Sequence, residues 1–217
     1  MTLSQKKLAL LIALSAWFAV IVQLVMGIGN SSLVLGTYLV RFFSYFTILT
    51  NLMIAVGYTY LLSGAKKSVG VFFERSTTLT ALTLYILLVG IVYNVALRFL
   101  WQPEGMARLT DELLHSVIPL LVLLYWWRIP TKGNLQWRNL WLWLVYPLVY
   151  LFYTLGHGAV SGFYPYPFVD VSTLGIEQVL INSAIVAAVI VGLGGILIGI
   201  DRFLGRSPKK KALQNRG

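Results

Sequence analysis

The amino-acid sequence predicts an all-α, polytopic integral membrane protein, a bundle of six transmembrane helices with both termini in the cytoplasm. Of its 217 residues, 58% are hydrophobic and only 11% are charged, whereas a soluble domain carries about 25% charged residues. The apolar residues fall into separate runs of about 20, the length of helix that crosses roughly 30 Å of hydrocarbon. Basic residues gather at alternate ends of these runs, which gives the bundle an expected orientation.

Six expected spans follow one another along residues 1–204, which we interpret as a single transmembrane domain. They cover residues 8–28, 38–62, 77–97, 113–127, 140–163 and 176–200. The apolar core of the fourth span is short, so its helix is expected to begin earlier, near Leu109. The first span is too long for a removed signal peptide and lacks the small-residue cleavage site. Residues 205–217 are basic and polar, and we expect them to form a disordered cytoplasmic tail.

Lysine and arginine residues are unevenly divided between the two sides of the predicted bundle. The N-terminus, the second and fourth loops and the C-terminal tail hold 14 of the 17. The opposite side holds only Arg41, Arg98 and Arg108. Because loops on the cytoplasmic side carry the excess of basic residues, both termini are expected in the cytoplasm.

The sequence predicts no metal centre, no cofactor and no nucleic-acid partner. The chain has no cysteine, and its two histidines do not form an HExxH motif. The net charge of +10 has a simpler explanation, because basic residues of a membrane protein set its orientation and contact anionic lipid. The aromatic residues lie in apolar runs rather than between basic ones, unlike those of a nucleic-acid-binding surface.

The second span carries small polar side chains in its middle, in the segment SYFTILTN that begins at Ser44. At 100° per residue, a continuous helix places four polar residues within about 60° of one another. They are Ser44, Thr47, Asn51 and Tyr58. Counted from the outer end of the span, Thr47 lies roughly 14 Å deep. Because a hydroxyl or amide in hydrocarbon needs a partner, we expect this stripe to face the bundle interior, as helix-packing contacts or as a site.

Polar and titratable residues also gather at the outer ends of three later spans. Asp111 and His115 are four residues apart on the fourth span and therefore share a helix face. Asn94 and Arg98 have the same spacing on the third. The fifth span carries a helical stripe that ends in a histidine: Tyr146, Tyr150, Tyr153 and His157. Thr47, Asn94, His115 and His157 all count to the outer half of their spans, so we expect them to meet at one polar cavity.

These residues can supply a nucleophile and its base. A hydroxyl becomes nucleophilic when a neighbouring base takes its proton and a third group orients that base. Thr47 can be the hydroxyl, His115 the base and Asp111 the orienting group. The sequence has no GxSxG motif, which excludes the common α/β-hydrolase architecture.

Three segments resemble the androgen-induced-gene family, polytopic membrane proteins that hydrolyse fatty acid esters of hydroxy fatty acids. They are FTILTN in the second span, DELLHSVIP from Asp111, and GHGAVSGFYPYPF, which ends at Phe168. The family uses an intramembrane threonine and a histidine as its catalytic pair. The resemblance assigns these roles to Thr47 and to His115.

The third segment, with His157 and the Tyr166-Pro-Phe sequence, matches a histidine and a Tyr-Pro-Phe element of the same family. Two features depart from the pattern of the animal members. In the animal members the histidine and the following proline, here His115 and Pro119, stand one residue further apart. Those members also have an acidic residue three positions after the threonine, where this chain has Thr50. The compact size and basic tail indicate a bacterial relative, located in the cell's inner membrane.

The sequence therefore predicts an intramembrane lipid ester hydrolase with Thr47 as nucleophile and His115 as base, and with membrane lipids as its other partners. Asn51 or Ser44 is expected to stabilise the oxyanion, and Arg98 to hold a carboxylate or head group. The full set of expected substrate-binding residues is Ser44, Asn51, Asn94, Arg98, Asp111, Tyr150, His157 and Tyr166. The alternatives are a small transporter, a non-catalytic lipid-binding protein and a structural partner subunit. No inverted repeat of the transporter type is evident.

Overall fold

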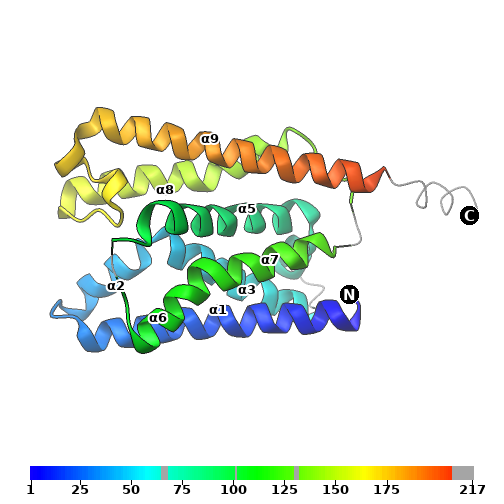
Figure 1. Ribbon diagram of the computed structural model, residues 1–217, viewed down its shortest axis with the longest axis horizontal. Helices are drawn as coiled ribbons and strands as arrows, with labels where there is room; N and C mark the ends of the chain where they lie inside the picture. Colours follow the sequence, from blue (N-terminus) through cyan, green and yellow to red (C-terminus); the bar gives the residue numbers. More distant parts are fainter. Residues whose placement is uncertain (65–67, 101, 130–131, 207–217) are drawn as a thin grey trace, which may run out of the picture.

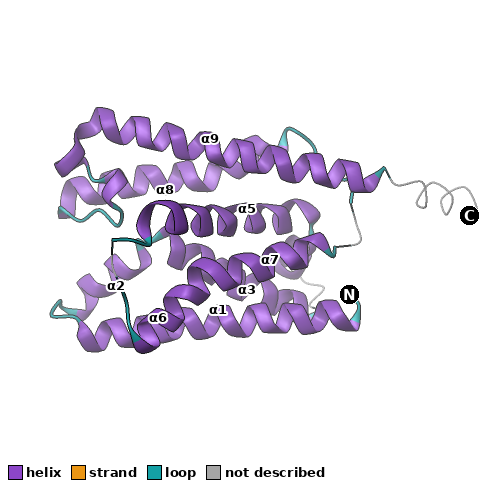
Figure 2. Ribbon diagram, viewed as in Figure 1, coloured by secondary structure: helices purple, strands orange, loops and turns teal. Residues whose placement is uncertain are grey.

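A computed structural model of the protein describes residues 1–64, 68–100, 102–129 and 132–206. This described chain is built of helices, without strands (Figure 2). Six helices within it are long and apolar enough to cross a membrane. They confirm the predicted all-α bundle of six spans and indicate an integral membrane protein.

The first three spans contain one break and one irregular turn. The first span is α1 (Leu3–Asn30). The second is α3 (Phe46–Ser63), which follows the short helix α2 (Leu35–Phe43). The third consists of α5 (Ser76–Val92) and a turn of π-helix, η1 (Tyr93–Leu97).

The fourth span is also irregular, whereas the last two are long helices. The fourth joins α6 (Gly105–Glu112), a second π-helical turn, η2 (Leu113–Val117), and α7 (Ile118–Trp127). The fifth and sixth are α8 (Asn139–Ser161) and α9 (Val171–Gly205). Both π-helical turns therefore lie within candidate spans, and such turns occur frequently at functional sites.

The helices form a packed group and an outer pair. α1, α3, α5 and α7 pack together, and α8 and α9 lie along one side of them (Figure 1). In the most apolar stretches of α3 and α5, 56% of the residues are buried, compared with 11% in α8 and 22% in α9. The outer pair therefore presents most of its apolar surface outward, as helices in contact with lipid do.

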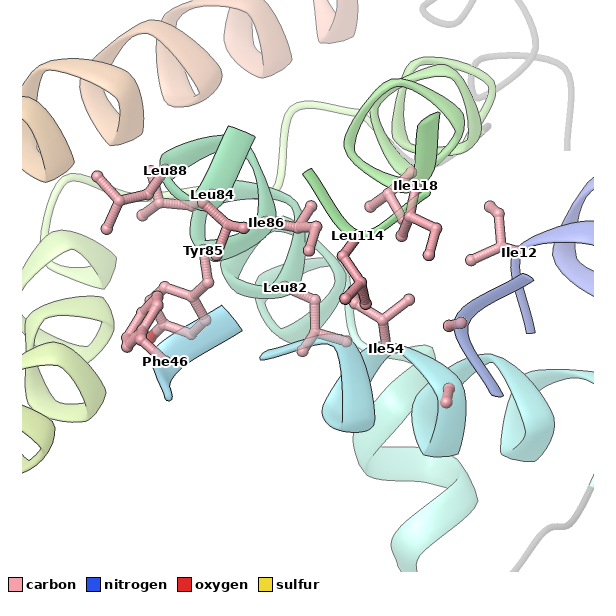
Figure 3. Packing of buried hydrophobic residues seen from close by; sticks show 14 of the residues in the cluster. Ile12, Phe46, Ile54, Leu82, Leu84, Tyr85, Ile86, Leu88, Leu114 and Ile118 are labelled. Atoms are coloured by element: carbon pink, nitrogen blue, oxygen red, sulfur yellow. The ribbon is translucent and has the colours of Figure 1, made fainter. Parts of the chain in front are cut away.

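The packed group is held by small residues and by a branched apolar core. α1 approaches α3 closely because it buries alanines at helical spacing: Ala9, Ala13, Ala16 and Ala19. Deeper in the bundle, Leu114 of η2 packs near Ile54 of α3 and Ile86 of α5 (Figure 3). Because Leu114 is 1% exposed, this core fixes the position of the neighbouring His115.

The first residues of α1 and the last residues of α9 lie at the same end of the bundle (Figure 1). At that end the Gln5 amide donates to the Arg128 carbonyl at 2.9 Å, which ties α1 to the end of α7. The opposite end holds α2, the connection between α8 and α9, and the start of α6 (Figure 1), and we call it the α2 end. The sequence predicts that the α2 end faces outward from the cytoplasm.

The second span is not the continuous helix predicted for residues 38–62. α2 ends at Phe43 and α3 begins at Phe46, because Tyr45 between them is extended, with φ −78° and ψ 126°. The Ser44 hydroxyl bonds the carbonyl four residues earlier, which competes with continuation of the helix. The predicted polar stripe is therefore wrong at its start, since Ser44 does not share a helix with Thr47, Asn51 and Tyr58. The depth counted for Thr47 along one helix does not apply.

Other boundaries differ less. The helix of the fourth span begins at Gly105, before the predicted Leu109. α9 begins at Val171, but Gly175 interrupts the regular helix with a left-handed φ of 76°. Uninterrupted helix therefore starts at Ile176, the predicted start of the sixth span. The sequence predicts no helix between α3 and α5, where the structure has α4 (Ser68–Glu74). Of the predicted tail, the part beyond Arg206 lies outside the described residues.

Orientation can be tested with single cysteines, since the natural chain has none. Ser32 is exposed between α1 and α2, and Asn134 is exposed between α7 and α8. In intact cells a membrane-impermeant maleimide is expected to label Ser32→Cys. It is expected to label Asn134→Cys only after permeabilisation, because basic loops stay cytoplasmic. The reverse labelling pattern would place the α2 end in the cytoplasm.

Candidate functional site

The break between α2 and α3 frees backbone polar groups, and side chains of α8 bond them. The Ser44 hydroxyl donates to the Val40 carbonyl at 2.7 Å and lies 2.7 Å from the Tyr153 hydroxyl. The Ser44 carbonyl accepts a hydrogen bond from the Tyr150 hydroxyl at 2.9 Å. Irregular backbone is tolerated at membrane depth only where it is buried in protein or lines a water-filled cavity. Ser44 and Tyr150, both expected to bind substrate, thus hold the break together.

Thr47 is the second residue of α3, where backbone N–H groups have no partner inside the helix. Its N–H donates to the Tyr166 hydroxyl at 3.1 Å, and its own hydroxyl lies 3.2 Å from the same oxygen. Both residues are buried. Burial raises the pKa of Tyr166 to about 12, against the opposing effect of the Thr47 hydrogen bonds. Tyr166 therefore keeps its proton at physiological pH and remains a donor beside Thr47.

His115 and Asp111 form a hydrogen-bonded pair, as their spacing predicts. The His115 Nδ1 atom lies 3.1 Å from Asp111 Oδ1 and 2.9 Å from the Asp111 carbonyl oxygen. Two acceptors at Nδ1 assign the proton to that atom and leave Nε2 able to accept one. The Tyr93 ring stacks on the imidazole with centroids 3.9 Å apart, and its hydroxyl donates to Asp111 Oδ2. These contacts hold the imidazole as an oriented base.

Pro119 explains the π-helical turn around His115. Proline has no N–H, so the His115 carbonyl, four residues earlier, has no α-helical partner. Within η2 the Ile118 N–H bonds the Leu113 carbonyl, so the Leu114 carbonyl also lacks its α-helical partner. Two adjacent buried carbonyls therefore need donors from outside the helix.

Two asparagines from neighbouring spans supply these donors. Asn94 Nδ2 donates to the His115 carbonyl at 3.2 Å, and Asn51 Nδ2 lies 3.4 Å from the Leu114 carbonyl. Asn51 also donates to the Thr47 carbonyl at 2.9 Å, so one amide connects the first turn of α3 to the His115 turn. The sequence assigned both asparagines to substrate binding, whereas the structure uses their N–H groups to hold the backbone of the site.

A cavity of about 600 Å³ brings the expected catalytic residues to one space. Thr47, Asp111, His115 and Tyr166 all lie in its wall, which continues past Arg41 to the connection between α1 and α2. In the described structure Thr47 and His115 share no direct hydrogen bond, because Thr47 bonds Tyr166 and His115 bonds Asp111. Both side chains nevertheless line the same cavity.

A second, narrower space of about 100 Å³ shares Thr47, Leu97 and Tyr166 with the wall of this cavity. It runs between α5, α8 and α9, past apolar side chains such as Val89, Leu148 and Val186, and no charged side chain lines it. We call it the apolar groove. Thr47 thus lines both the cavity and the apolar groove, an arrangement that the sequence does not predict.

Arg98 does not line the cavity. Its guanidinium pairs with Glu112 Oε2 at 2.7 Å, donates to Asn94 Oδ1 at 2.9 Å and lies 3.1 Å from the Ser116 hydroxyl. The arginine that was expected to hold a substrate carboxylate therefore has a carboxylate partner within the protein. Arg41, which the sequence did not single out, lies in the cavity wall instead.

His157 lies apart from the Thr47–His115 cavity. It lines a separate recess of about 380 Å³ at the α2 end, together with Arg41 and Ser161. Its ring stacks on Tyr153 with centroids 5.6 Å apart, and its Nδ1 lies 3.3 Å from the Ser161 hydroxyl. The structure therefore does not bring both histidines to one place.

Comparisons of the chain with protein-family models, curated proteins and solved structures find no match. Within the described chain, no group of three or more His, Asp and Glu side chains lies close enough to hold a metal ion. The chemistry that these residues offer is that of a hydroxyl, an imidazole and a carboxylate. Function is therefore inferred from the geometry of the cavity and from the short motifs noted in the sequence.

The role of Pro119 and Asn94 can be tested with a double-mutant cycle. Asn94→Leu removes the donor to the His115 carbonyl and is expected to lower stability by about 1–3 kcal/mol. Pro119→Ala provides an N–H four residues after His115, so Asn94→Leu is expected to cost less in that background. Thermal unfolding in detergent measures both effects. Gln178→Leu, at an exposed amide on α9, is the control and is expected to change stability by less than about 0.5 kcal/mol. Additive effects of the two substitutions would contradict this account.

Proposed function

We propose that the protein is an intramembrane ester hydrolase that acts on lipid esters, with Thr47 as nucleophile and His115 as base. The observation that carries the proposal is that both side chains line one cavity, while Asp111 bonds the imidazole at Nδ1 rather than at Nε2. A hydroxyl, a base and a group that orients the base are the parts that nucleophilic ester cleavage requires. The resemblance to the androgen-induced-gene hydrolases assigns the same two residues.

In the proposed reaction, Thr47 Oγ1 attacks the ester carbonyl carbon while His115 Nε2 takes the hydroxyl proton. The carbonyl oxygen becomes an oxyanion. The tetrahedral intermediate then collapses, the C–O bond to the alcohol breaks, and His115 returns the proton to the leaving alcohol. A water molecule, deprotonated by His115, attacks the acyl-threonine; the bond to Thr47 Oγ1 then breaks, His115 returns the proton to that oxygen, and the fatty acid leaves. Asp111 stabilises the imidazolium that forms in each half of the reaction.

Tyr166 is the oxyanion donor in this proposal. The Tyr166 hydroxyl is neutral, buried and within hydrogen-bond distance of Thr47. Donors that are already placed in a site with little water contribute most to lowering the barrier. The donors expected from the sequence, Ser44 and Asn51, are occupied by backbone carbonyls.

The proposed substrate is a fatty acid ester, such as an ester of a hydroxy fatty acid. The apolar groove suits an acyl chain, because each buried methylene contributes about 0.8 kcal/mol. Thr47 lies where the groove meets the cavity, so the carbonyl carbon of a chain lying in the groove would stand beside it. With the α2 end outward, the lipid would enter from the outer leaflet of a bacterial inner membrane.

One observation favours a second candidate, a small transporter. A span broken beside a polar cavity is typical of secondary transporters, whose substrates bind where helices are interrupted. A transporter or lipid-binding protein has no need of an oriented base, and it forms no acyl-enzyme. Covalent labelling of Thr47 by an activated phosphonate therefore separates the two functions.

The central prediction concerns the catalytic pair. Thr47→Ala and His115→Ala are each expected to lower hydrolysis of a long-chain ester by about 10³-fold or more. The double variant should be little worse, because members of one catalytic unit act non-additively. Thr47→Ser should keep part of the activity, since the hydroxyl remains. Release of fatty acid by purified protein and phosphonate labelling are the two measurements.

Thr50→Ala is the matched control for the nucleophile. Thr50 is a buried threonine of the same helix, outside the cavity wall, with its hydroxyl 3.3 Å from the Tyr146 hydroxyl. This variant is expected to retain hydrolysis and labelling within about tenfold of the natural protein. Full hydrolysis by purified Thr47→Ala would contradict the mechanism.

Tyr166→Phe tests the proposed oxyanion donor. Removing one such donor is expected to lower kcat by about 10²-fold with little change in KM, because the oxyanion exists only after attack. Tyr164→Phe, in the same connection between α8 and α9, is the control and should leave kcat nearly unchanged. An unchanged kcat in Tyr166→Phe would remove Tyr166 from the mechanism.

A further inference from the structure

We propose that Arg41 is a specificity residue, which binds an acidic group on the alcohol part of the ester while the acyl chain lies in the apolar groove. The inference rests on the proposed esterase function. It assigns a role to a residue of the α2 end that neither the motifs nor the polar stripe of the sequence identified.

Arg41 lies in the last turn of α2, just before the break, and forms part of the wall of the cavity that contains Thr47 and His115. Its guanidinium carbon stands 4.6 Å from the centroid of the Phe163 ring, a cation–π contact that positions the group without neutralising it. Among the described residues, no carboxylate lies within ion-pairing distance of Arg41. A guanidinium in a cavity without a protein anion is suited to a ligand carboxylate or phosphate.

The other two arginines predicted for this side differ from Arg41. Arg98 is paired with Glu112 at 2.7 Å, so its charge is already matched. Arg108 is exposed on α6 and does not line the cavity. Arg41 alone of the three combines a place in the cavity wall with an unmatched charge.

The charges of the cavity favour an anion at Arg41 rather than elsewhere. Its wall holds one other ionised side chain, Asp111, whose carboxylate is bonded to both Tyr93 and His115. The other polar residues of the wall include Gln23, Asn30 and Tyr38, which are neutral amides and a phenol. An acidic group that enters the cavity therefore finds its single free cation, among the described residues, at Arg41.

The two spaces divide the substrate at the scissile bond. The groove is apolar and lacks charge, so a carboxylate cannot enter it without losing hydration. The acyl chain is thus assigned to the groove and the acid-bearing alcohol to the cavity, with the ester carbonyl at Thr47. An ester with no acid on its alcohol part gains nothing from Arg41.

The test uses two esters that differ only at the acid of the alcohol part, one free and one capped as a methyl ester, with protein purified in neutral detergent. Arg41→Gln is expected to lower kcat/KM for the free acid about tenfold or more, through KM, because a lost charge-assisted hydrogen bond weakens binding by about that factor. The capped ester should change by less than about twofold. Arg41→Lys should recover part of the selectivity, since lysine keeps the positive charge but lacks the paired N–H donors of the guanidinium.

Arg108→Gln is the matched control, since it removes the same charge from the same end of the bundle. It is expected to change both esters by less than about twofold. Equal losses on both esters in Arg41→Gln would show a structural role and overturn the proposal. No loss on either ester would also overturn it and would leave Arg41 as a contact for membrane phosphates.

A binding measurement separates this inference from the proposed function. In Thr47→Ala protein, a fluorescent long-chain fatty acid is displaced by the free-acid ester or by its capped partner. The proposed role of Arg41 is supported if Arg41→Gln removes the preference for the free acid in this background. It is overturned if the preference persists. If the natural protein hydrolyses neither ester, the proposed function fails, while the displacement result still decides the role of Arg41.

Discussion

Interrupting a helix inside a bilayer frees N–H and C=O groups that lipid cannot bond, and the site depends on how this chain bonds them. Between α2 and α3 the freed groups are paired with the Tyr150 and Tyr166 hydroxyls, from α8 and from the connection that follows it. These contacts bring the outer pair of helices to the break. They also place Thr47 at the start of a helix, where its N–H and its hydroxyl meet the same partner. A continuous helix at this position would have bonded that N–H to its own backbone.

The fourth span uses the same principle with a different cause. Pro119 removes one N–H, and donors from the second and third spans bond the carbonyls left over. Gly90 of α5 lets the third and fourth spans lie close together at this point, because a Cβ atom at Gly90 would lie 3.1 Å from the His115 carbonyl oxygen. Asn51 completes the link, since its amide donates to the Thr47 carbonyl and lies within reach of the Leu114 carbonyl. The proposed nucleophile and base, Thr47 and His115, are thus held by backbone contacts rather than by a bond between their side chains.

The sequence predicts the six spans and the Asp111–His115 pair, because both follow from helical periodicity and spacing. The break at Tyr45 could not be predicted, since neither proline nor glycine marks it, and a serine bonded to the carbonyl four residues earlier also occurs within continuous helix, as at Ser183. Tyr93 escaped notice because a π-helical turn shifts residues away from α-helical spacing. Arg98 and Arg41 look alike in sequence, as each is a single basic residue near the outer end of a span. Only the position of Glu112 across the bundle separates a paired arginine from a free one.

Hydrolysis inside a membrane needs water at the carbonyl carbon and a dry place for the chain. In this bundle the proposed reaction would find both at one residue, because Thr47 lies in the wall of both the cavity and the apolar groove. Tyr166 lines both spaces as well. The break that places Thr47 at the start of α3 also ends α2 at Phe43, so Arg41 lies in the last turn of α2, four residues before the extended Tyr45. A single interruption of one span therefore sets both the place of the proposed nucleophile and the place of the charge that would select its substrate.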